Sequence, residues 1–345
     1  NASYTGWHTG YPDALARVDL RTCRRVPWDG GVPFFLADFE DEDGAALPVC
    51  PRRLLKGVTE LAAEHGFVAK VGMEFEWFNF AESSQSLAQH QAKPQPITPG
   101  MFGYSLLRMS KNLPFFNALM DDLAAFGVPL EGLHTETGPG VLEAAIVNSD
   151  ALEGADRAVL FKAGTKEIAH RFGIMPSFMA KWNTTLPGCS GHTHLSLWKG
   201  EKNAFHDADD PLKMSATMRS FVAGLLRYLP DILPVFAPTV NSYKRLVDGY
   251  WAPTKPTWGV DNRTVAVRVI PGSAKSTRLE MRVPGSDVNP YLAVAGTLAA
   301  GLRGVIDELP LEQEPIRGSA YLDGAIARLP RSPDEAPERM AASRA

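Results

Sequence analysis

Glutamate and histidine side chains recur in this sequence inside segments that read as strands. Glu74 and Glu76 lie two residues apart in GMEFEWFNF, and the period of two in a strand places both carboxylates on one face. His192 and His194 repeat this arrangement in SGHTHLSLW. Carboxylates in an aromatic-rich strand are costly to bury unless they are paired or bind a metal. The pattern therefore indicates either a solvated sheet face or a cation site.

Further carboxylates occur in two other segments. Glu136 and Glu143 flank the Gly-Pro-Gly of HTETGPGVLEAAI, whose turn allows the two acids to converge. Glu280 lies in TRLEMRV. A ligand set of several carboxylates with one histidine suits Mg²⁺ or Mn²⁺ better than zinc. A lone pair of histidines under a sheet is weak support for a metal, so the interpretation depends on all the clusters together.

Four arginines follow the acidic segments, on runs that also read as strands: Arg263, Arg268, Arg278 and Arg282. Several arginines aimed at one place suit a substrate that gathers negative charge, and phosphate is the commonest such group. Metal ions with an arginine clamp are typical of phosphoryl transfer. The segment 272–276 lacks the first glycine of a P-loop, so a P-loop NTPase is not expected.

Composition excludes several other classes of protein. The chain has 345 residues with 35 basic and 39 acidic side chains. It therefore lacks the excess of basic residues that would favour binding to nucleic acid. The longest apolar run, 291–302, is too short to span a bilayer. Three scattered cysteines indicate neither a disulfide framework nor a zinc knuckle. We expect a cytoplasmic protein with no nucleic-acid or membrane partner, whose natural start lies upstream of Asn1.

Periodicity predicts the elements that must position these side chains. Helices are expected over 51–65, 113–126, 151–172, 209–229 and 290–306. Strands are expected over 67–80, 131–146, 190–198, 263–270 and 277–283, with 81–104 as an irregular surface excursion. Strands and helices do not alternate strictly, so the pattern favours an α+β fold around a largely antiparallel sheet over a doubly wound fold.

Six segments resemble, in order, the signature segments of the glutamine synthetase family: GMEFEWFNF, HTETGPGVLEAAI, SGHTHLSLW, NSYKRLVDGYWAP, DNRTVAVRV and TRLEMRVPGSDVNPY. The resemblance covers residues 10 to 310 approximately. Within the family, the sequence resembles most the class I branch that includes γ-glutamylpolyamine and γ-glutamylamide synthetases. It implies a catalytic domain whose curved antiparallel sheet forms a bifunnel half-barrel, preceded by a β-grasp domain. Residues 1–40 would be the incomplete end of that β-grasp region, and 41–345 a catalytic domain with a shortened C-terminus. Family members assemble as stacked hexamer rings, so a homo-oligomer is implied.

The resemblance also implies a role for each matching residue. The first of two or three Mg²⁺ or Mn²⁺ ions would be bound by Glu76, Glu136 and Glu143, and the second by Glu74, His192 and Glu280. Glutamate would be held through its α-carboxylate by Arg245, with the backbone of Gly188 nearby. The transferred phosphoryl group would contact Arg263 and Arg282. ATP would be bound through its phosphates by Arg268 and Arg278, in a nucleotide site lined by Ser196 and Trp198.

One departure from the family pattern concerns the amine. Ammonia-using members read NSYKRLxPGYEAP, and the glutamate of that flap closes the ammonium site and accepts a proton. Here Trp251 stands at that position and Asp248 replaces the proline. An indole cannot deprotonate ammonium but can stack on an organic amine. A polyamine would need a carboxylate from elsewhere, such as Asp248.

Three functions stay open at this point. The first is an ATP-dependent ligase that joins glutamate to an organic amine, whether polyamine, alkylamine or aromatic amine, through γ-glutamyl phosphate. The second is a glutamine synthetase that uses ammonia, in which Trp251 merely packs the flap. The third is a non-catalytic protein on the same scaffold, which the complete set of expected metal-ligand types disfavours.

Overall fold

The computed structural model describes residues 5–91, 93–322 and 324–343. Its strands are β1 (Leu15–Val26), β2 (Val32–Glu40), β3 (Val68–Phe80), β4 (Leu130–Thr135), β5 (Val141–Ile146), β6 (Ser149–Asp150), β7 (Met175–Ser177), β8 (Gly191–Lys199), β9 (Lys202–Asn203), β10 (Trp258–Val260), β11 (Val267–Ile270) and β12 (Arg278–Met281). Its α-helices are α1 (Pro51–Glu64), α2 (Ser84–Gln89), α3 (Leu106–Lys111), α4 (Leu113–Ala125), α5 (Ala151–His170), α6 (Ala216–Tyr228), α7 (Leu233–Phe236), α8 (Val240–Arg245), α9 (Pro290–Ile306) and α10 (Glu335–Ala342).

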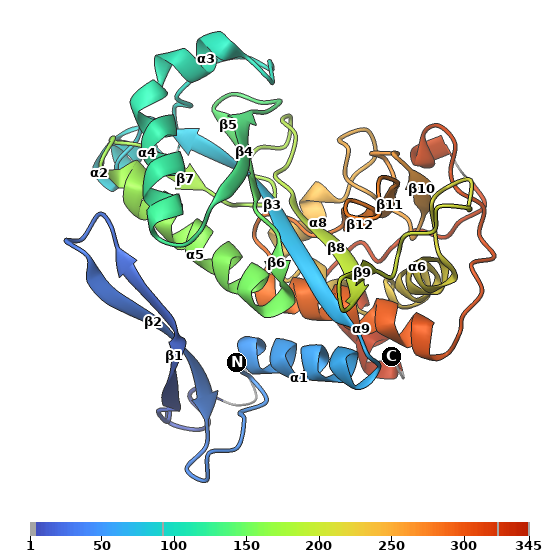
Figure 1. The fold of residues 1–345 in the computed structure, drawn as a ribbon. Coiled ribbons are helices and arrows are strands. Elements are labelled where there is room, and N and C mark those ends of the chain that lie inside the picture. The colour runs from blue at the N-terminus through green and yellow to red at the C-terminus, as the bar shows by residue number, and fades with distance from the viewer. Residues whose placement is uncertain (1–4, 92, 323, 344–345) are drawn as a thin grey trace.

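An open sheet of ten strands forms the centre of the molecule (Figure 1). Its main path runs β10–β11–β12–β8–β3–β5–β4, and the short strands β6, β7 and β9 pair beside it. Only the β10–β11 pair in the described sheet is parallel, and the other pairs are antiparallel. Within the 13 residues of β3, residues 68–75 pair with β8 on one side and residues 74–78 pair with β5 on the other. This arrangement confirms the predicted α+β fold with a largely antiparallel sheet.

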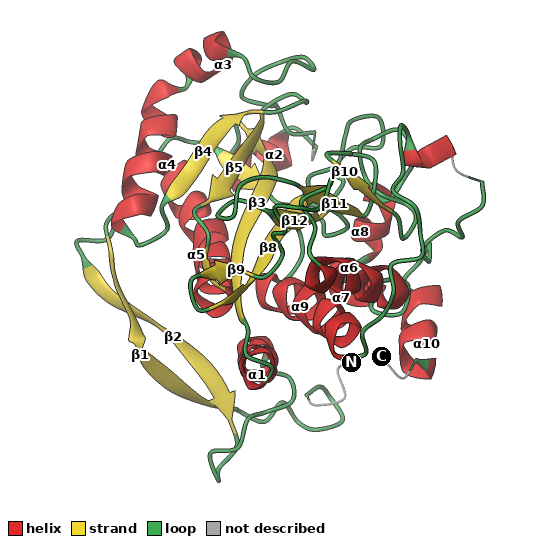
Figure 2. Cartoon of the chain, turned by 45° about the vertical axis from the view of Figure 1, so that its right-hand side comes forward, coloured by secondary structure: helices red, strands yellow, loops and turns green. Residues whose placement is uncertain are grey.

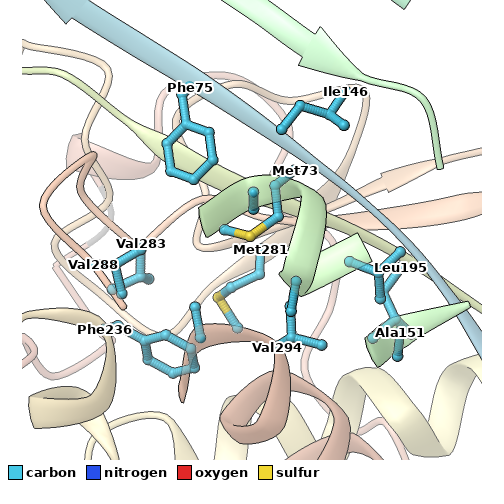
Figure 3. Close-up of a cluster of buried hydrophobic side chains, with 14 of the residues drawn as sticks. Met73, Phe75, Ile146, Ala151, Leu195, Phe236, Met281, Val283, Val288 and Val294 are labelled. Carbon is cyan, nitrogen blue, oxygen red and sulfur yellow. The ribbon is translucent and has the colours of Figure 1, made fainter. Parts of the chain in front are cut away.

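One face of the sheet forms the main hydrophobic core. Figure 3 shows Met73 and Phe75 of β3 beside Leu195 of β8, Met281 of β12 and Val294 of α9. Each of these side chains is at most 1% exposed. Helices α5 and α9 pack against this side of the sheet (Figure 2). Because side chains alternate along a strand, the intervening residues of β3 and β8 must face the other way.

Strands β1 and β2 form a separate antiparallel hairpin, which lies beside α1 (Figure 1). Its attachment to the rest of the molecule is ionic as well as apolar. Arg52 of α1 donates hydrogen bonds to Asp38 of β2 at 3.1 Å and to Asp156 of α5 at 2.8 Å. In the hairpin turn, Trp28 packs edge-on against Phe126, with 5.0 Å between ring centres. A buried charge cluster therefore joins the hairpin to two helices.

Four of the predicted helices, 51–65, 113–126, 151–172 and 290–306, are confirmed by α1, α4, α5 and α9. The predicted helix 209–229 is too long, because α6 begins at Ala216. The side chain of Asp210 accepts bonds from two following backbone N–H groups and holds that segment in turns. Ser215 then caps the first turn of α6.

The strand predicted over 263–270 begins only at Val267. The side-chain oxygen of Asn262 accepts bonds from the backbone N–H of Thr264 at 2.9 Å and from its hydroxyl at 2.7 Å. These bonds form an Asx turn, which competes with strand pairing. Arg263 therefore lies in a loop, and the prediction that it lies on a strand was wrong.

The strand predicted over 131–146 is a hairpin of β4 and β5. Its turn contains Gly138 and Gly140, whose φ angles are +141° and +71°. A Cβ atom at position 140 would lie 2.5 Å from the carbonyl oxygen of Asn79. Glycine is therefore required there both for backbone conformation and for close approach to β3.

Several short elements were not predicted. No predicted counterpart exists for the helices α2, α3, α7, α8 and α10, and the hairpin of β1 and β2 was expected only through the resemblance, as the end of a β-grasp region. The helices in this set have at most 8 residues, too few for a periodic pattern to emerge from the sequence. The described residues of the segment 81–104, which are all but residue 92, are irregular apart from α2, as expected for a surface excursion.

Candidate functional site

Three carboxylates meet on the polar face of the sheet, beside β3 and β5. Glu76 pairs with Glu143 across the β3–β5 ladder, and Glu136 follows the last residue of β4. One oxygen of each carboxylate lies within 4.8 Å of the other two. The backbone N–H of Ser190 donates to Glu76 at 2.7 Å, and His134 Nε2 lies 3.2 Å from Glu143 Oε1. The predicted ligands of the first metal are thus brought together.

Burial, with a smaller contribution from neighbouring carboxylates, disfavours ionisation in this first acidic group. Burial raises the pKa of Glu143 to about 7, and the charges of Glu74 and Glu76 act in the same direction. Burial also raises the pKa of Glu136, again with a contribution from Glu76. The hydrogen bond to Glu143 raises the pKa of His134 to about 9. Among the described residues, nothing donates to Glu136 Oε2 although it is buried. A divalent cation fits this set because it would satisfy that oxygen and relieve the repulsion.

A second group combines carboxylates and histidines across β3, β8 and β12. His192 Nδ1 lies 3.1 Å from Glu74 Oε1 and 3.0 Å from Glu280 Oε1. Glu74, Glu280 and His194 each offer a ligand atom within 4.8 Å of the others. The structure therefore brings together the three predicted residues and adds His194, which the pattern of alternation had placed beside His192 but to which the resemblance assigned no role.

These histidines keep their carboxylate partners ionised. Burial opposes the charge on Glu74, but hydrogen bonds from His192 and His194 outweigh it and lower the pKa of that carboxyl. Burial likewise opposes the charge on Glu280, whose pKa is lowered by His192 and Arg282. His192 Nε2 is buried and has no hydrogen-bond partner in the described part of the chain. This donor set also fits a divalent cation.

A cavity of about 300 Å³ lies over the first acidic group. We call it the acid-rich cavity. Ten of the predicted site residues line it: Glu74, Glu76, Glu136, Glu143, Gly188, His192, Arg245, Trp251, Arg263 and Arg282.

A second cavity, of about 420 Å³, adjoins the first. We call it the nucleotide-side cavity because Ser196, Trp198 and Arg278, which were predicted to contact ATP, all line it. The indole N–H of Trp198 donates to the hydroxyl of Ser196 at 2.9 Å, and Lys70 Nζ lies 4.4 Å from the centre of the Trp198 ring. Glu74 is the residue, among those described, that lines both cavities.

Two arginines enclose Glu280. Arg268 donates to Glu280 at 3.1 Å and to Asp261 at 3.2 Å, while Arg282, directly after β12, donates to the other oxygen of Glu280. Arg268 and Glu280 are not among the described residues that line either cavity. The contact of Arg268 with ATP phosphate stays a prediction, and its observed partner is a predicted metal ligand.

The predicted glutamate-binding residues are packed against each other. Arg245 is 4% exposed, and its guanidinium donates to the carbonyl oxygens of Val283 at 2.9 Å and Arg282 at 3.3 Å. A Cβ atom at Gly188 would lie 2.8 Å from Arg245 Cγ and 2.4 Å from the carbonyl oxygen of Ala180. Glycine is needed at position 188 for Arg245 to reach the acid-rich cavity.

Two aromatic residues at the acid-rich cavity have left-handed backbone conformations. Trp251 has φ of +56° and is 53% exposed, which disfavours the alternative that it only packs the flap. Tyr104 has φ of +50°, and its ring stacks on His134 with 4.7 Å between centres. Tyr104 was not predicted, because it lies at the end of the irregular segment 81–104, where no periodic pattern indicates which way a side chain points.

In the part of the chain that the structure describes, no helix is both long and apolar enough to cross a membrane.

The family model for the glutamine synthetase catalytic domain matches residues 48–345. Type-1 glutamine synthetase 2 of Dictyostelium discoideum is 57% identical over 350 residues, which cover 100% of this chain and 67% of that protein. Gamma-glutamylethanolamide synthetase GlnA4 of Streptomyces coelicolor is 39% identical over 338 residues, 97% of this chain and 71% of that protein.

A solved structure has the same fold. The complex of GmaS with ADP superimposes with a TM-score of 0.86 at 31% sequence identity, covering 96% of this chain and 76% of that one. The likeness in sequence and in fold agrees with the ordered motifs and with the geometry of the two cavities. This chain therefore belongs to the glutamine synthetase family, whose members are ATP- and divalent-metal-dependent ligases.

Proposed function

We propose that this protein joins the γ-carboxyl group of glutamate to an organic amine in an ATP-dependent reaction through γ-glutamyl phosphate. The observation that carries the proposal is Trp251, a half-exposed indole lining the acid-rich cavity. By resemblance, ammonia-using members have a glutamate there that accepts a proton from ammonium. An indole cannot accept it, but offers stacking or cation–π attraction to an amine substituent. The name of the Streptomyces coelicolor relative, a gamma-glutamylethanolamide synthetase, supports an organic amine.

The two groups of carboxylates and histidines would bind at least two Mg²⁺ or Mn²⁺ ions. Glu76, Glu136 and Glu143 would hold one, and Glu74, Glu280 and a histidine the other. Bound cations would supply charge neutralisation for phosphoryl transfer. Both His192 and His194 are close enough to contribute to the second set.

In the first step, the glutamate γ-carboxylate attacks the γ-phosphorus of ATP and ADP leaves. Arg245 would hold the α-carboxylate of glutamate inside the acid-rich cavity. Arg263 and Arg282 line the same cavity, where they would stabilise negative charge on the transferred group. ATP would occupy the nucleotide-side cavity against Arg278, with Glu74 between the two substrates.

In the second step, the nitrogen of a neutral amine attacks the γ-carbonyl carbon. A C–N bond forms, the C–O bond to phosphate breaks, and the proton that the nitrogen loses leaves on the departing phosphate. An amine that is already neutral near pH 7, such as an arylamine, needs no base in the flap. Trp251 would then bind its substituent rather than its proton.

A second candidate is a glutamine synthetase that uses ammonia. The specific observation in its favour is the 57% identical relative, which is named a type-1 glutamine synthetase. That reaction would require another residue to accept the ammonium proton. A non-catalytic protein is disfavoured because most of the carboxylates, histidines and arginines of the site line two adjoining cavities.

The test is phosphate release from ATP and glutamate across a panel of amines that includes ammonium, ethanolamine, alkylamines, polyamines and arylamines. We expect an organic amine to exceed ammonium in kcat/KM. Highest kcat/KM with ammonium would favour the second candidate. No release with any amine, in the presence of Mg²⁺ or Mn²⁺, would favour a non-catalytic protein.

The setting of the enzyme is also proposed from the resemblance. Residues 1–40 would belong to the β-grasp region, which agrees with the separate β1–β2 hairpin, and residues 41–345 to the catalytic domain. Stacked hexamer rings are the expected assembly, which sedimentation would test. The three cysteines are unpaired, as is usual in the reducing cytoplasm.

A further inference from the structure

The loop that carries Trp251, residues 248–254, is closed on itself by a side chain. Asp248 Oδ1 accepts a hydrogen bond from the hydroxyl of Thr254 at 2.7 Å. Arg328, from the C-terminal part of the chain, donates to both carboxylate oxygens of Asp248, at 2.7 and 3.1 Å. This bidentate geometry fixes direction as well as distance.

The same C-terminal segment makes further contacts with the loop. The backbone N–H of Leu329 donates to the carbonyl oxygen of Thr254 at 2.9 Å. The hydroxyl of Tyr321 donates to the carbonyl oxygen of Ala252 at 3.2 Å. Tyr321 and Leu329 therefore support the loop in addition to the ion pair of Arg328.

The conformation of the loop needs such support. Trp251 has φ of +56°, a left-handed conformation that costs a residue with a side chain about 1–2 kcal/mol. Gly249, two residues earlier, has φ of +84°, which glycine adopts readily. An unfavourable φ persists only where neighbouring contacts fix the backbone on both sides. Here Asp248 fixes the loop before Trp251, and Ala252 and Thr254 fix it after.

We propose that Asp248 and Arg328 are positioning residues, whose ion pair holds the 248–254 loop so that Trp251 forms the amine-binding wall of the acid-rich cavity. This inference rests on the proposed function for the identity of the amine. It also assigns Asp248 a role other than proton acceptor for a polyamine, since both of its oxygens already accept bonds. The two side chains are 41% and 32% exposed, so solvent weakens the pair and a moderate effect is expected.

The experiment compares Arg328→Ala with Arg339→Ala. Arg339 also forms an exposed ion pair in the C-terminal region, with Asp231 at 2.6 Å, but it does not bind the loop. We expect Arg328→Ala to raise the KM for the best amine about five- to tenfold and to leave the KM for ATP within about twofold. Arg339→Ala should change neither constant by more than about twofold.

A graded pair of substitutions separates positioning from a general loss of structure. Arg328→Lys keeps the positive charge but loses the bidentate geometry, so its amine KM should lie between those of the parent and Arg328→Ala. Asp248→Asn keeps an oxygen that can accept from Thr254 and should reproduce part of the defect. Equal effects of Arg328→Ala and Arg339→Ala, equal changes in all substrate KM values, or an amine KM unchanged in Asp248→Asn would each overturn the proposal. The amine used is whichever serves the parent enzyme best, ammonium included. A preference for ammonium would therefore refute the organic-amine function while still testing the loop.

Discussion

The two faces of the central sheet are built from the same strands and have opposite energetic roles. In β3, Met73 and Phe75 lie on the apolar face, and Glu74 and Glu76 lie on the polar face. The apolar face removes hydrocarbon from water and stabilises the fold. The polar face carries the first acidic group, in which the buried carboxylates of Glu136 and Glu143 have raised pKa values and, without a cation, cost stability when ionised. Because side chains alternate along a strand, neighbouring residues of β3 lie on opposite faces, one set stabilising the fold and the other forming the site.

The sheet register makes the polar face continuous. Glu76 is paired with Glu143 on β5, and Glu74 with His192 on β8. His194 is paired in turn with Glu280 on β12. Substitutions on the polar face are therefore expected to change turnover with little loss of stability, and substitutions on the apolar face to do the reverse.

The largest effect is expected for removal of a metal-binding carboxylate. Glu76→Ala and Glu136→Ala should each lower turnover by at least about a thousandfold, because the cation loses a ligand. Phosphate release with saturating Mg²⁺ or Mn²⁺ measures this, and Glu60→Ala on the exposed face of α1 is the control. Near-normal turnover in both variants would show that the metal assignment is wrong.

On the apolar face, Phe75→Ala should lower the free energy of unfolding by about 3–5 kcal/mol, because a fully buried ring is replaced by a cavity. Urea denaturation measures the change. The matched control is Phe102→Ala, since that ring is 73% exposed and its loss should cost less than about 0.5 kcal/mol. Similar losses in the two variants would contradict the division between the faces.

Two arginines of the acid-rich cavity, Arg263 and Arg282, should act on the transition state. Arg263→Ala or Arg282→Ala is expected to lower kcat about a hundredfold, since the charge they stabilise develops during transfer. ATP affinity, measured by equilibrium binding, should change far less. A variant altered in ATP affinity alone would assign that arginine to nucleotide binding instead.

A smaller effect is expected at Trp251. Trp251→Glu should move the ratio of kcat/KM values toward ammonium by about tenfold, because a carboxylate can accept the ammonium proton. Trp251→Phe keeps an aromatic wall and should retain the preference of the parent enzyme. If the parent prefers ammonium and Trp251→Glu leaves the ranking unchanged, the interpretation of the flap fails.

The smallest effect is a gain in stability on the polar face. The pKa of Glu143 rises from 4.5 to about 7 on folding, so the folded state binds more protons in this interval. In metal-free protein, the contribution of Glu143 to stability must therefore fall as pH rises from about 4.5 to 7. Glu143→Gln should raise the free energy of unfolding on the order of 1 kcal/mol at pH 8, with little change at pH 4.5. Denaturation in the presence of a chelator measures both values, and a loss at pH 8 would contradict the repulsion.

Part of this site could be predicted from the sequence. The period of two placed Glu74 with Glu76 and His192 with His194 on common faces, because alternation is a local property of strands. The partner of each residue across the sheet is not local. The resemblance to known motifs, rather than periodicity, grouped Glu76 with Glu136 and Glu143.

Other features have no signal in the sequence. Arg263 lies in a loop because an asparagine side chain competes with strand pairing, which composition does not reveal. Tyr104 reaches the acid-rich cavity from an irregular segment, whose path depends on tertiary contacts. The Asp248–Arg328 pair joins residues 80 positions apart, a contact that no short-range pattern predicts.

Glu74 is the shared wall of the two cavities, and this has a consequence for how such an enzyme can diversify. The loop that carries Trp251 borders the acid-rich cavity and not the nucleotide-side cavity, within the described residues. Substitutions in that loop can alter the acceptor while the nucleotide half keeps its shape. Glu74 lines both cavities, so a substitution there would change the two cavities together. The molecule is in this sense modular, and we expect new acceptors to be evolved or engineered through residues 248–254 while Glu74 stays invariant.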